Sequence, residues 1–164
     1  APAHHFGDAT GLLTALAREG FLEFASRLSQ AVEAADSDPS RRLYALCTTY
    51  VDFALQNPTR IQLMFQNDLI DCKQGDFNAV ANAAFELLAE AIRAIRGLAP
   101  HADLATADYG ALLATWSMVH GFSQLALGQQ FDGAARSLGG RKAIMEKMLP
   151  AMLTYLPMPA TKQG

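Results

Sequence analysis

The chain has few residues whose types and spacing could support catalysis or metal binding. His4 and His5 are adjacent, so on a helix they point in different directions, and a metal site would need more ligands than the nearby sequence supplies. The sequence contains no Glu-x-x-His pair, no His-Glu-x-x-His, no Gly-x-Ser-x-Gly and no glycine-rich phosphate loop. We therefore predict no catalytic residue, no metal site and no cofactor, and we expect a protein that is not an enzyme.

The two cysteines are interpreted from their surroundings. Cys47 shares an apolar helical face with Leu43 and Tyr50, which indicates a buried and inert thiol. Cys72 lies in a charged loop and is either an ordinary thiol or a redox sensor. Two cysteines in 164 residues are too few for a disulfide framework, which favours a reducing, intracellular setting.

Aromatic and methionine side chains at helical spacing are the remaining candidates for function. They could fill a core, or they could line an apolar pocket around a few polar groups. His120 follows Trp116 by four residues, so both point the same way, and His120 is either a hydrogen-bonded core histidine or a ligand contact. The candidate pocket residues are Tyr50, Phe53, Met64, Phe65, Phe85, Leu88, Trp116, Ser117 and His120.

Helices must position these residues, because apolar residues recur at three- and four-residue spacing and no strand-like alternation is evident. Asp8, Asp38 and Asn57 are the expected N-caps, and Pro150 should kink the last helix. The spacing predicts an all-α bundle of about six helices, over residues 8–35, 39–56, 58–67, 77–96, 104–127 and 140–156. The apolar stripe expected on the first helix is Leu12, Leu13, Leu16, Phe21, Phe24, Leu28 and Val32.

The last two predicted helices carry more apolar surface than one small core absorbs. Residues 109–131 include no charged side chain, yet they contain several polar ones and are flanked by Asp108 and Asp132. We interpret this segment as a helix buried within protein and predict no membrane association. We also predict a homodimer in which the last two helices of each subunit form a four-helix interface. Its candidate residues are Phe122, Leu125, Met145, Met148 and Met152.

Composition excludes several classes of protein. With 51% hydrophobic and 18% charged residues, the chain is not disordered, and 164 residues suffice for one ordinary domain. Thirteen basic and sixteen acidic residues give a net charge of −3, so the chain is no scaffold for wrapping nucleic acid. The N-terminus has no signal-peptide pattern, and we expect a cytoplasmic protein.

Three motifs, in this order, resemble those of TetR-family transcriptional regulators. AHHFGD at residues 3–8, with a leucine pair at 12–13, resembles the junction that closes the family's DNA-binding domain. FALQNP at 53–58, followed by LMF at 63–65, resembles a helix break of the family. WSMVHG at 116–121 resembles the Trp-x-x-x-His-Gly variant of its penultimate helix. Ala3 and Ala9 depart from the tyrosine and lysine that are usual at these positions, so only His5 matches the family's phosphate contacts.

This resemblance implies a domain organisation and a function. Residues 1–7 would be the end of a helix-turn-helix DNA-binding domain, and residues 8–164 the effector-binding and dimerisation domain. The expected protein is a homodimeric repressor that binds operator DNA through helices preceding residue 1. A small effector that binds in the helical pocket would release the DNA. We expect this effector to be mainly apolar, because the inward-facing polar groups are few and neutral. The alternative is a helical small-molecule-binding module, or an enzyme, without a DNA-binding head.

Overall fold

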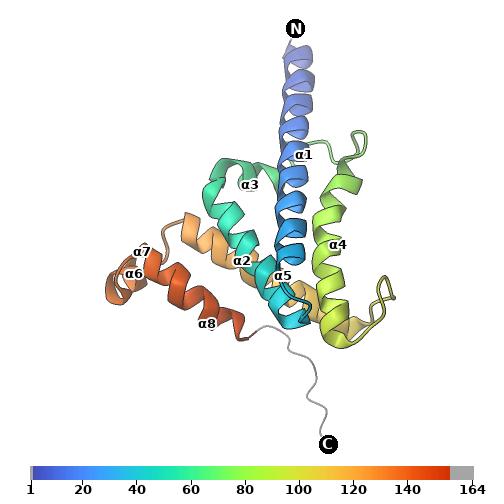
Figure 1. Ribbon diagram of the computed structural model, residues 1–164. Coiled ribbons are helices and arrows are strands. Elements are labelled where there is room, and N and C mark those ends of the chain that lie inside the picture. The colour runs from blue at the N-terminus through green and yellow to red at the C-terminus, as the bar shows by residue number, and fades with distance from the viewer. Residues whose placement is uncertain (1, 156–164) are drawn as a thin grey trace, which may run out of the picture.

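The computed structural model describes residues 2–155, and it describes their side chains except at residues 2–8 and 141. All regular elements in this range are helical, which confirms the predicted all-α fold. The helices are α1 (Pro2–Ala34), α2 (Pro39–Gln56), α3 (Pro58–Met64), α4 (Phe77–Arg96), α5 (Thr106–Leu127), α6 (Asp132–Leu138), α7 (Arg141–Ala143), η1 (Ile144–Met148) and α8 (Leu149–Leu153) (Figure 1).

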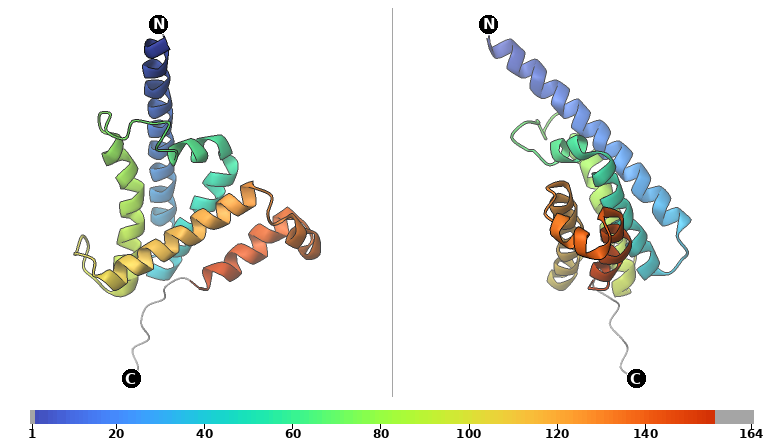
Figure 2. Two further views of the ribbon diagram at one scale, coloured as in Figure 1. Left: turned by 180° about the vertical axis from the view of Figure 1, so that it is seen from behind. Right: turned by 90° about the vertical axis from the view of Figure 1, so that its left-hand side faces the viewer.

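The helices surround a core that α1 covers on one side. α1 packs against α2, α3 and α4, and α5 packs against α2 and α4. The N-terminal part of α1 projects beyond the other helices (Figure 1). Figure 2 shows α1 on one side of the molecule and α5 to α8 on the other. The domain therefore has one face formed by α1 and an opposite face formed by α5 to α8, and α2 and α4 pack between α1 and α5.

Local sequence signals set several helix boundaries as predicted. The Asp38 carboxylate accepts a hydrogen bond from the Arg41 backbone N–H at 2.9 Å and caps α2, with a proline at the first helical position. Gly97 ends α4 in a left-handed conformation with φ of 70°. Asn57 is the N-cap residue of α3 and a proline follows it, as predicted, but its side chain makes no capping bond to α3: its amide donates to the Phe53 carbonyl at 3.0 Å, at the end of α2.

The structure corrects the start and the buried face of α1. The helix begins at Pro2 and runs through Asp8 without a break, so Asp8 is not an N-cap. Its buried positions follow a heptad-like spacing at residues 14, 17, 21, 24 and 28. Leu12 and Leu16 lie off this face and are 62% and 49% exposed. The predicted stripe is confirmed at Phe21, Phe24 and Leu28 and is wrong at Leu12 and Leu16, because Thr14 and Ala17 face the core in that part of the helix.

The helix predicted over residues 140–156 is present over residues 141–153 as three consecutive helical segments, and the structure adds α6 before it. α6 was not predicted, because its short sequence has glycine and polar residues and little apolar periodicity. α7, η1 and α8 follow one another directly and form a C-terminal rod (residues 141–153). The Leu149 backbone N–H donates five residues back to Ile144, which makes a π-helical turn just before Pro150. This wider turn accommodates a proline that cannot donate a hydrogen bond.

The predicted charge-free segment forms α5 and the turn after it. Within residues 2–155, none of the helices is both long enough and apolar enough to span a bilayer. α5 buries one face, which includes Leu112, Thr115 and Val119, against the rest of the domain. Its other face leaves Tyr109 and Leu113 each 49% exposed. Within one chain, α5 is therefore covered on one side only.

Candidate ligand-binding cavity

A cavity of about 460 Å³ lies among α1, α2, α4 and α5, and α3 and residues 65–76 close over one end of it. This volume is within the roughly 300–1,000 Å³ that is usual for small-molecule sites. The lining residues are Phe21, Phe24, Leu28, Leu46, Cys47, Tyr50, Met64, Phe65, Asn67, Cys72, Phe77, Asn78, Ala81, Asn82, Ala84, Phe85, Leu88, Trp116 and Val119.

The lining is mostly apolar and contains no Asp, Glu, Lys, Arg or His side chain. Its buried part includes Phe24, Leu46 and Cys47, which are at most 3% exposed. Burial raises the pKa of the Cys47 thiol to about 12, so this thiol is protonated and unreactive near neutral pH, as predicted. A charged ligand group would find no ionic partner among these residues, whereas an apolar group would be well accommodated.

Six of the nine predicted pocket residues line this cavity. They are Tyr50, Met64, Phe65, Phe85, Leu88 and Trp116. Phe53 does not line it, because its ring is fully buried against Phe24, with ring centroids 4.9 Å apart. Ser117 does not line it either, since its side chain is exposed on the outer face of α5. Phe53 was predicted as one of the aromatic residues at helical spacing and Ser117 as an inward-facing polar group, and the helices turn both away from the cavity.

His120 lies beside the cavity without lining it. Its Nδ1 is 2.8 Å from the Tyr50 hydroxyl, and its ring centroid is 5.0 Å from that of Phe65. Burial lowers the pKa of His120 below its usual value, so the ring is neutral at pH 7. Its Nδ1 can then accept a hydrogen bond from the Tyr50 hydroxyl. Burial also raises the pKa of Tyr50, which keeps the hydroxyl protonated. His120 thus holds the tyrosine that lines the cavity.

The sequence interpretation missed most of the cavity wall that α1 supplies, and it missed three asparagines. Asn67, Asn78 and Asn82 line the cavity and are exposed. Asn78 and Asn82 are four residues apart on α4, a spacing that places both side chains on one face and could have been noticed. Cys72 is half-buried beside them, and its Sγ lies 3.7 Å from the Asn67 side-chain oxygen.

Two direct links connect the segment over the cavity to α1. The buried Thr14 hydroxyl accepts a hydrogen bond from the Asp71 backbone N–H at 2.8 Å and donates to the Thr10 carbonyl at 2.7 Å. The Arg18 guanidinium donates to both Asp76 oxygens, at 2.6 and 2.7 Å. This pairing lowers the pKa of Asp76, which lies just before α4. The position of α1 is therefore coupled to residues that border the cavity.

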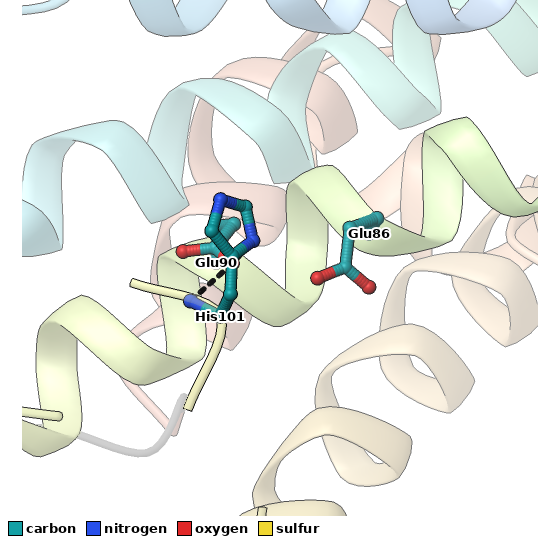
Figure 3. A group of neighbouring side chains, drawn as sticks. All are labelled: Glu86, Glu90 and His101. Carbon is teal, nitrogen blue, oxygen red and sulfur yellow. Dashed lines mark hydrogen bonds and ion pairs between the residues drawn. The ribbon is translucent and has the colours of Figure 1, made fainter. Parts of the chain in front are cut away.

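Glu86, Glu90 and His101 form a second cluster, at the turn between α4 and α5 (Figure 3). The Arg93 Nη1 donates to Glu86 at 2.6 Å and to Glu90 at 2.7 Å, and His101 Nδ1 lies 3.0 Å from Glu90. The guanidinium already supplies the positive charge that a metal ion would bring. Arg93 also donates to the Ala102 carbonyl, so this cluster fixes the connection between the two helices.

The residues predicted for the dimer interface lie in different environments. Phe122 is buried within the chain, where its ring packs 5.1 Å from that of Phe131. Leu125 on α5 and Met148 on η1 are 46% and 40% exposed. Met145 and Met152 are half-buried on the C-terminal rod. The side chain of His5, the predicted DNA contact, lies outside the described residues.

Comparison with known proteins agrees with this helical architecture. A solved structure, described as a protein with unknown function from Rhodococcus sp. RHA1, is similar to the chain with a TM-score of 0.69 and 27% identity. The similarity covers 88% of this chain and 71% of the Rhodococcus chain. No curated protein matches. The family model of the tetracyclin repressor-like C-terminal domain matches residues 43–152, and the chain therefore belongs to this family.

Proposed function

We propose that this chain is the effector-binding and dimerisation domain of a TetR-type repressor that releases operator DNA when a small, mainly apolar molecule binds. The observation that carries this proposal is the cavity of about 460 Å³ with no charged side chain in its lining. Apolar surface that leaves water on entering such a site contributes about 25 cal/mol per Å² before the costs of binding. The matched family is one of regulators, which favours this function over an enzymatic one.

The links between the cavity and α1 support a route from effector to DNA. A ligand that displaces residues 65–76 changes the contacts of Thr14 and Arg18, and so favours a different position of α1. The N-terminal part of α1 projects from the body of the domain (Figure 1). We place the operator-binding helices, with His5 as a phosphate contact, at this end. A shift of α1 in each subunit then changes the spacing of the two DNA-binding heads.

Dimerisation would use the face opposite α1. Tyr109, Leu113 and Leu125 lie along the outer face of α5 and are exposed, and Met148 is exposed on η1. α5 and the C-terminal rod have little contact with each other within one chain. A second copy could fill this space with the same two elements, as an isologous four-helix interface requires.

The ligand-binding half of the proposal is tested with the neutral fluorescent probe N-phenyl-1-naphthylamine. The probe should bind the chain saturably and raise its melting temperature by about 5 to 10 °C at a hundredfold excess over its Kd. Ala84 lines the cavity and Ala83 is the exposed neighbour outside it. Ala84→Trp should abolish binding, and the matched Ala83→Trp should leave it unchanged.

Ala81→Phe is a second cavity-filling variant, for the case that Ala84→Trp does not fold. Ala81 is half-buried and lines the cavity, and a phenylalanine there adds less volume than a tryptophan at Ala84. Each variant is checked by its helical circular dichroism before binding is measured. Absence of saturable binding to the wild type, or equal binding to Ala81→Phe and wild type, contradicts the proposed cavity.

The DNA-binding half of the proposal is tested on the gene product with its upstream coding sequence. That protein should bind its promoter and release it with an effector, whereas residues 1–164 alone should not bind the promoter.

A further inference from the structure

We infer that the ligand is an elongated amphiphile with an uncharged polar head, held with the head at Asn67, Asn78 and Asn82 and its hydrocarbon chain along α4. This inference rests on the proposed ligand-binding role of the cavity. It adds the orientation of the ligand, the chemistry of its head group and the residues that select it.

The polarity of the lining is asymmetric. The three asparagine side chains are exposed, whereas Leu28 and Leu46 are at most 4% exposed. Among the described residues, the Asn78 and Asn82 carboxamides make no hydrogen bond, and Asn67 has only the long contact from Cys72. The Tyr50 hydroxyl, by contrast, is already engaged by His120. The carboxamides at one end of the cavity are therefore the groups left to recognise a polar ligand head.

The cavity is long in the direction of α4. Its lining includes α4 positions from Asn78 to Leu88, and ten residues of helix correspond to about 15 Å at 1.5 Å per residue. Leu88 and, from the neighbouring helices, Leu28 and Leu46 line it away from the asparagines. An extended hydrocarbon chain of roughly ten carbon atoms fits within this length together with a head group, because carbon–carbon bonds of about 1.5 Å advance by less than that along a zigzag chain.

The charges around the asparagines favour an uncharged head. The lining offers neither a cation to pair with a carboxylate or phosphate nor a carboxylate to pair with an ammonium group. The nearby Arg18 guanidinium is occupied by both oxygens of Asp76. A carboxamide presents a donor and an acceptor together, which matches a hydroxyl or amide head that also donates and accepts. Three such groups satisfy both the donor and the acceptor of a neutral head, whereas a charged head would find no ionic partner among the lining residues.

The first experiment compares three ligands that share a ten-carbon chain. Decan-1-ol, decanoate and decyltrimethylammonium are titrated, below aggregation, against the chain loaded with N-phenyl-1-naphthylamine. We expect decan-1-ol to displace the probe with an inhibition constant at least about tenfold lower than either ion. Bound decan-1-ol should also slow the reaction of Cys72 with a thiol reagent, since Cys72 lines the same end of the cavity.

The second experiment changes the head-group preference. Asn82→Lys puts a cation at the polar end and should lower the inhibition constant of decanoate about tenfold while weakening decyltrimethylammonium. Ala83→Lys adds the same charge one residue away, on an exposed position outside the lining, and should change neither value. Asn82→Leu should weaken decan-1-ol severalfold, whereas Ala83→Leu, at the exposed position outside the lining, should change the binding of neither decan-1-ol nor N-phenyl-1-naphthylamine.

The outcomes separate this inference from the proposed function. If N-phenyl-1-naphthylamine binds but decanoate competes as well as decan-1-ol, the cavity is a ligand site and the inferred head group is wrong. If Asn82→Lys and Ala83→Lys behave alike, the polar head does not lie at the asparagines. If the probe does not bind the wild type at all, the proposed function itself fails, and this inference fails with it.

Discussion

The hydrogen bond between Tyr50 and His120 joins α2 to α5 at the edge of the cavity, across 70 residues of sequence. His120 must be neutral to accept this hydrogen bond, and its partial burial favours the neutral form. Tyr50 also packs edge-on against Phe24, with centroids 5.1 Å apart, so the pair fixes an aromatic side chain that the proposed ligand would touch. This polar pair thus fixes the orientation of the Tyr50 side chain in the wall of a largely apolar cavity.

The burial of His120 predicts a pH dependence of stability. Burial lowers the pKa of His120 in the folded chain below its ordinary value of 6.5, so the unfolded chain takes up the proton first as the pH falls. The stabilisation is complete above pH 6.5 and decreases below it. We expect the free energy of unfolding, from urea titrations at pH 7.5 and 5.5, to fall more in the wild type than in His120→Gln. An equal fall in both contradicts the assignment, whereas Tyr50→Phe, which keeps the histidine, should retain the wild-type dependence.

The sequence predicts the candidate site residues only in part, for a geometric reason. Helical spacing states which residues share a face, and it correctly grouped Trp116 with His120, whose rings both lie against Phe65, and Phe85 with Leu88, which both line the cavity. It does not state which face meets which neighbour. Phe53 and Ser117 were misplaced for this reason, and the cavity-facing asparagines were missed because polar residues on a helix are usually assigned to solvent. Tertiary packing, which one sequence does not reveal, decides these positions.

At the scale of elements, α1 is tied to residues 65–76 by the buried Thr14 hydroxyl. Thr14→Val keeps the shape of the side chain but leaves the Asp71 N–H without its partner, which costs about 1 kcal/mol or more. We expect hydrogen–deuterium exchange of the Asp71 amide to accelerate at least about fivefold. Thr48 is a matched control, because its hydroxyl donates only to carbonyls of its own helix.

If Thr48→Val accelerates exchange at Asp71 as much as Thr14→Val does, the effect is general destabilisation and the specific link is absent. If Thr14→Val leaves exchange unchanged, residues 65–76 are held by other contacts, such as the ion pair of Arg18 with Asp76.

Element boundaries were the most predictable feature of the fold. The ranges of α2 and α4 agree with the prediction, because a capping aspartate with a following proline and a left-handed glycine act locally. The start of α1 and the C-terminal rod were predicted less well. In α1, Asp8 has the residue type of a cap but lies inside a continuous helix. In the rod, the effect of Pro150 is a π-helical turn, whose hydrogen-bond pattern no simple sequence signal specifies.

At the scale of the whole molecule, one part of the apolar surface that a single chain leaves uncovered lies on α5 and the C-terminal rod, away from α1. Leu113 and Leu125 on α5 and Met148 on the C-terminal rod are between 40% and 49% exposed. Apolar side chains that gather on one side of a protein are typical of an interface, whereas scattered ones are ordinary surface. α1 also has exposed leucines. Substituting one of them tests whether loss of dimerisation is specific to the surface on α5 and the C-terminal rod.

We predict that the chain is a dimer at micromolar concentration in sedimentation velocity, and that Met148→Glu makes it a monomer. A carboxylate buried without a partner in an apolar interface costs several kcal/mol, which exceeds what most single contacts contribute. Leu22 on α1 is, like Met148, 40% exposed, so Leu22→Glu is the matched control and should remain dimeric. A monomeric wild type, or dissociation by both substitutions, would place the interface elsewhere. Because Met148 does not line the cavity, the Met148→Glu monomer should still bind N-phenyl-1-naphthylamine, which would separate assembly from effector binding.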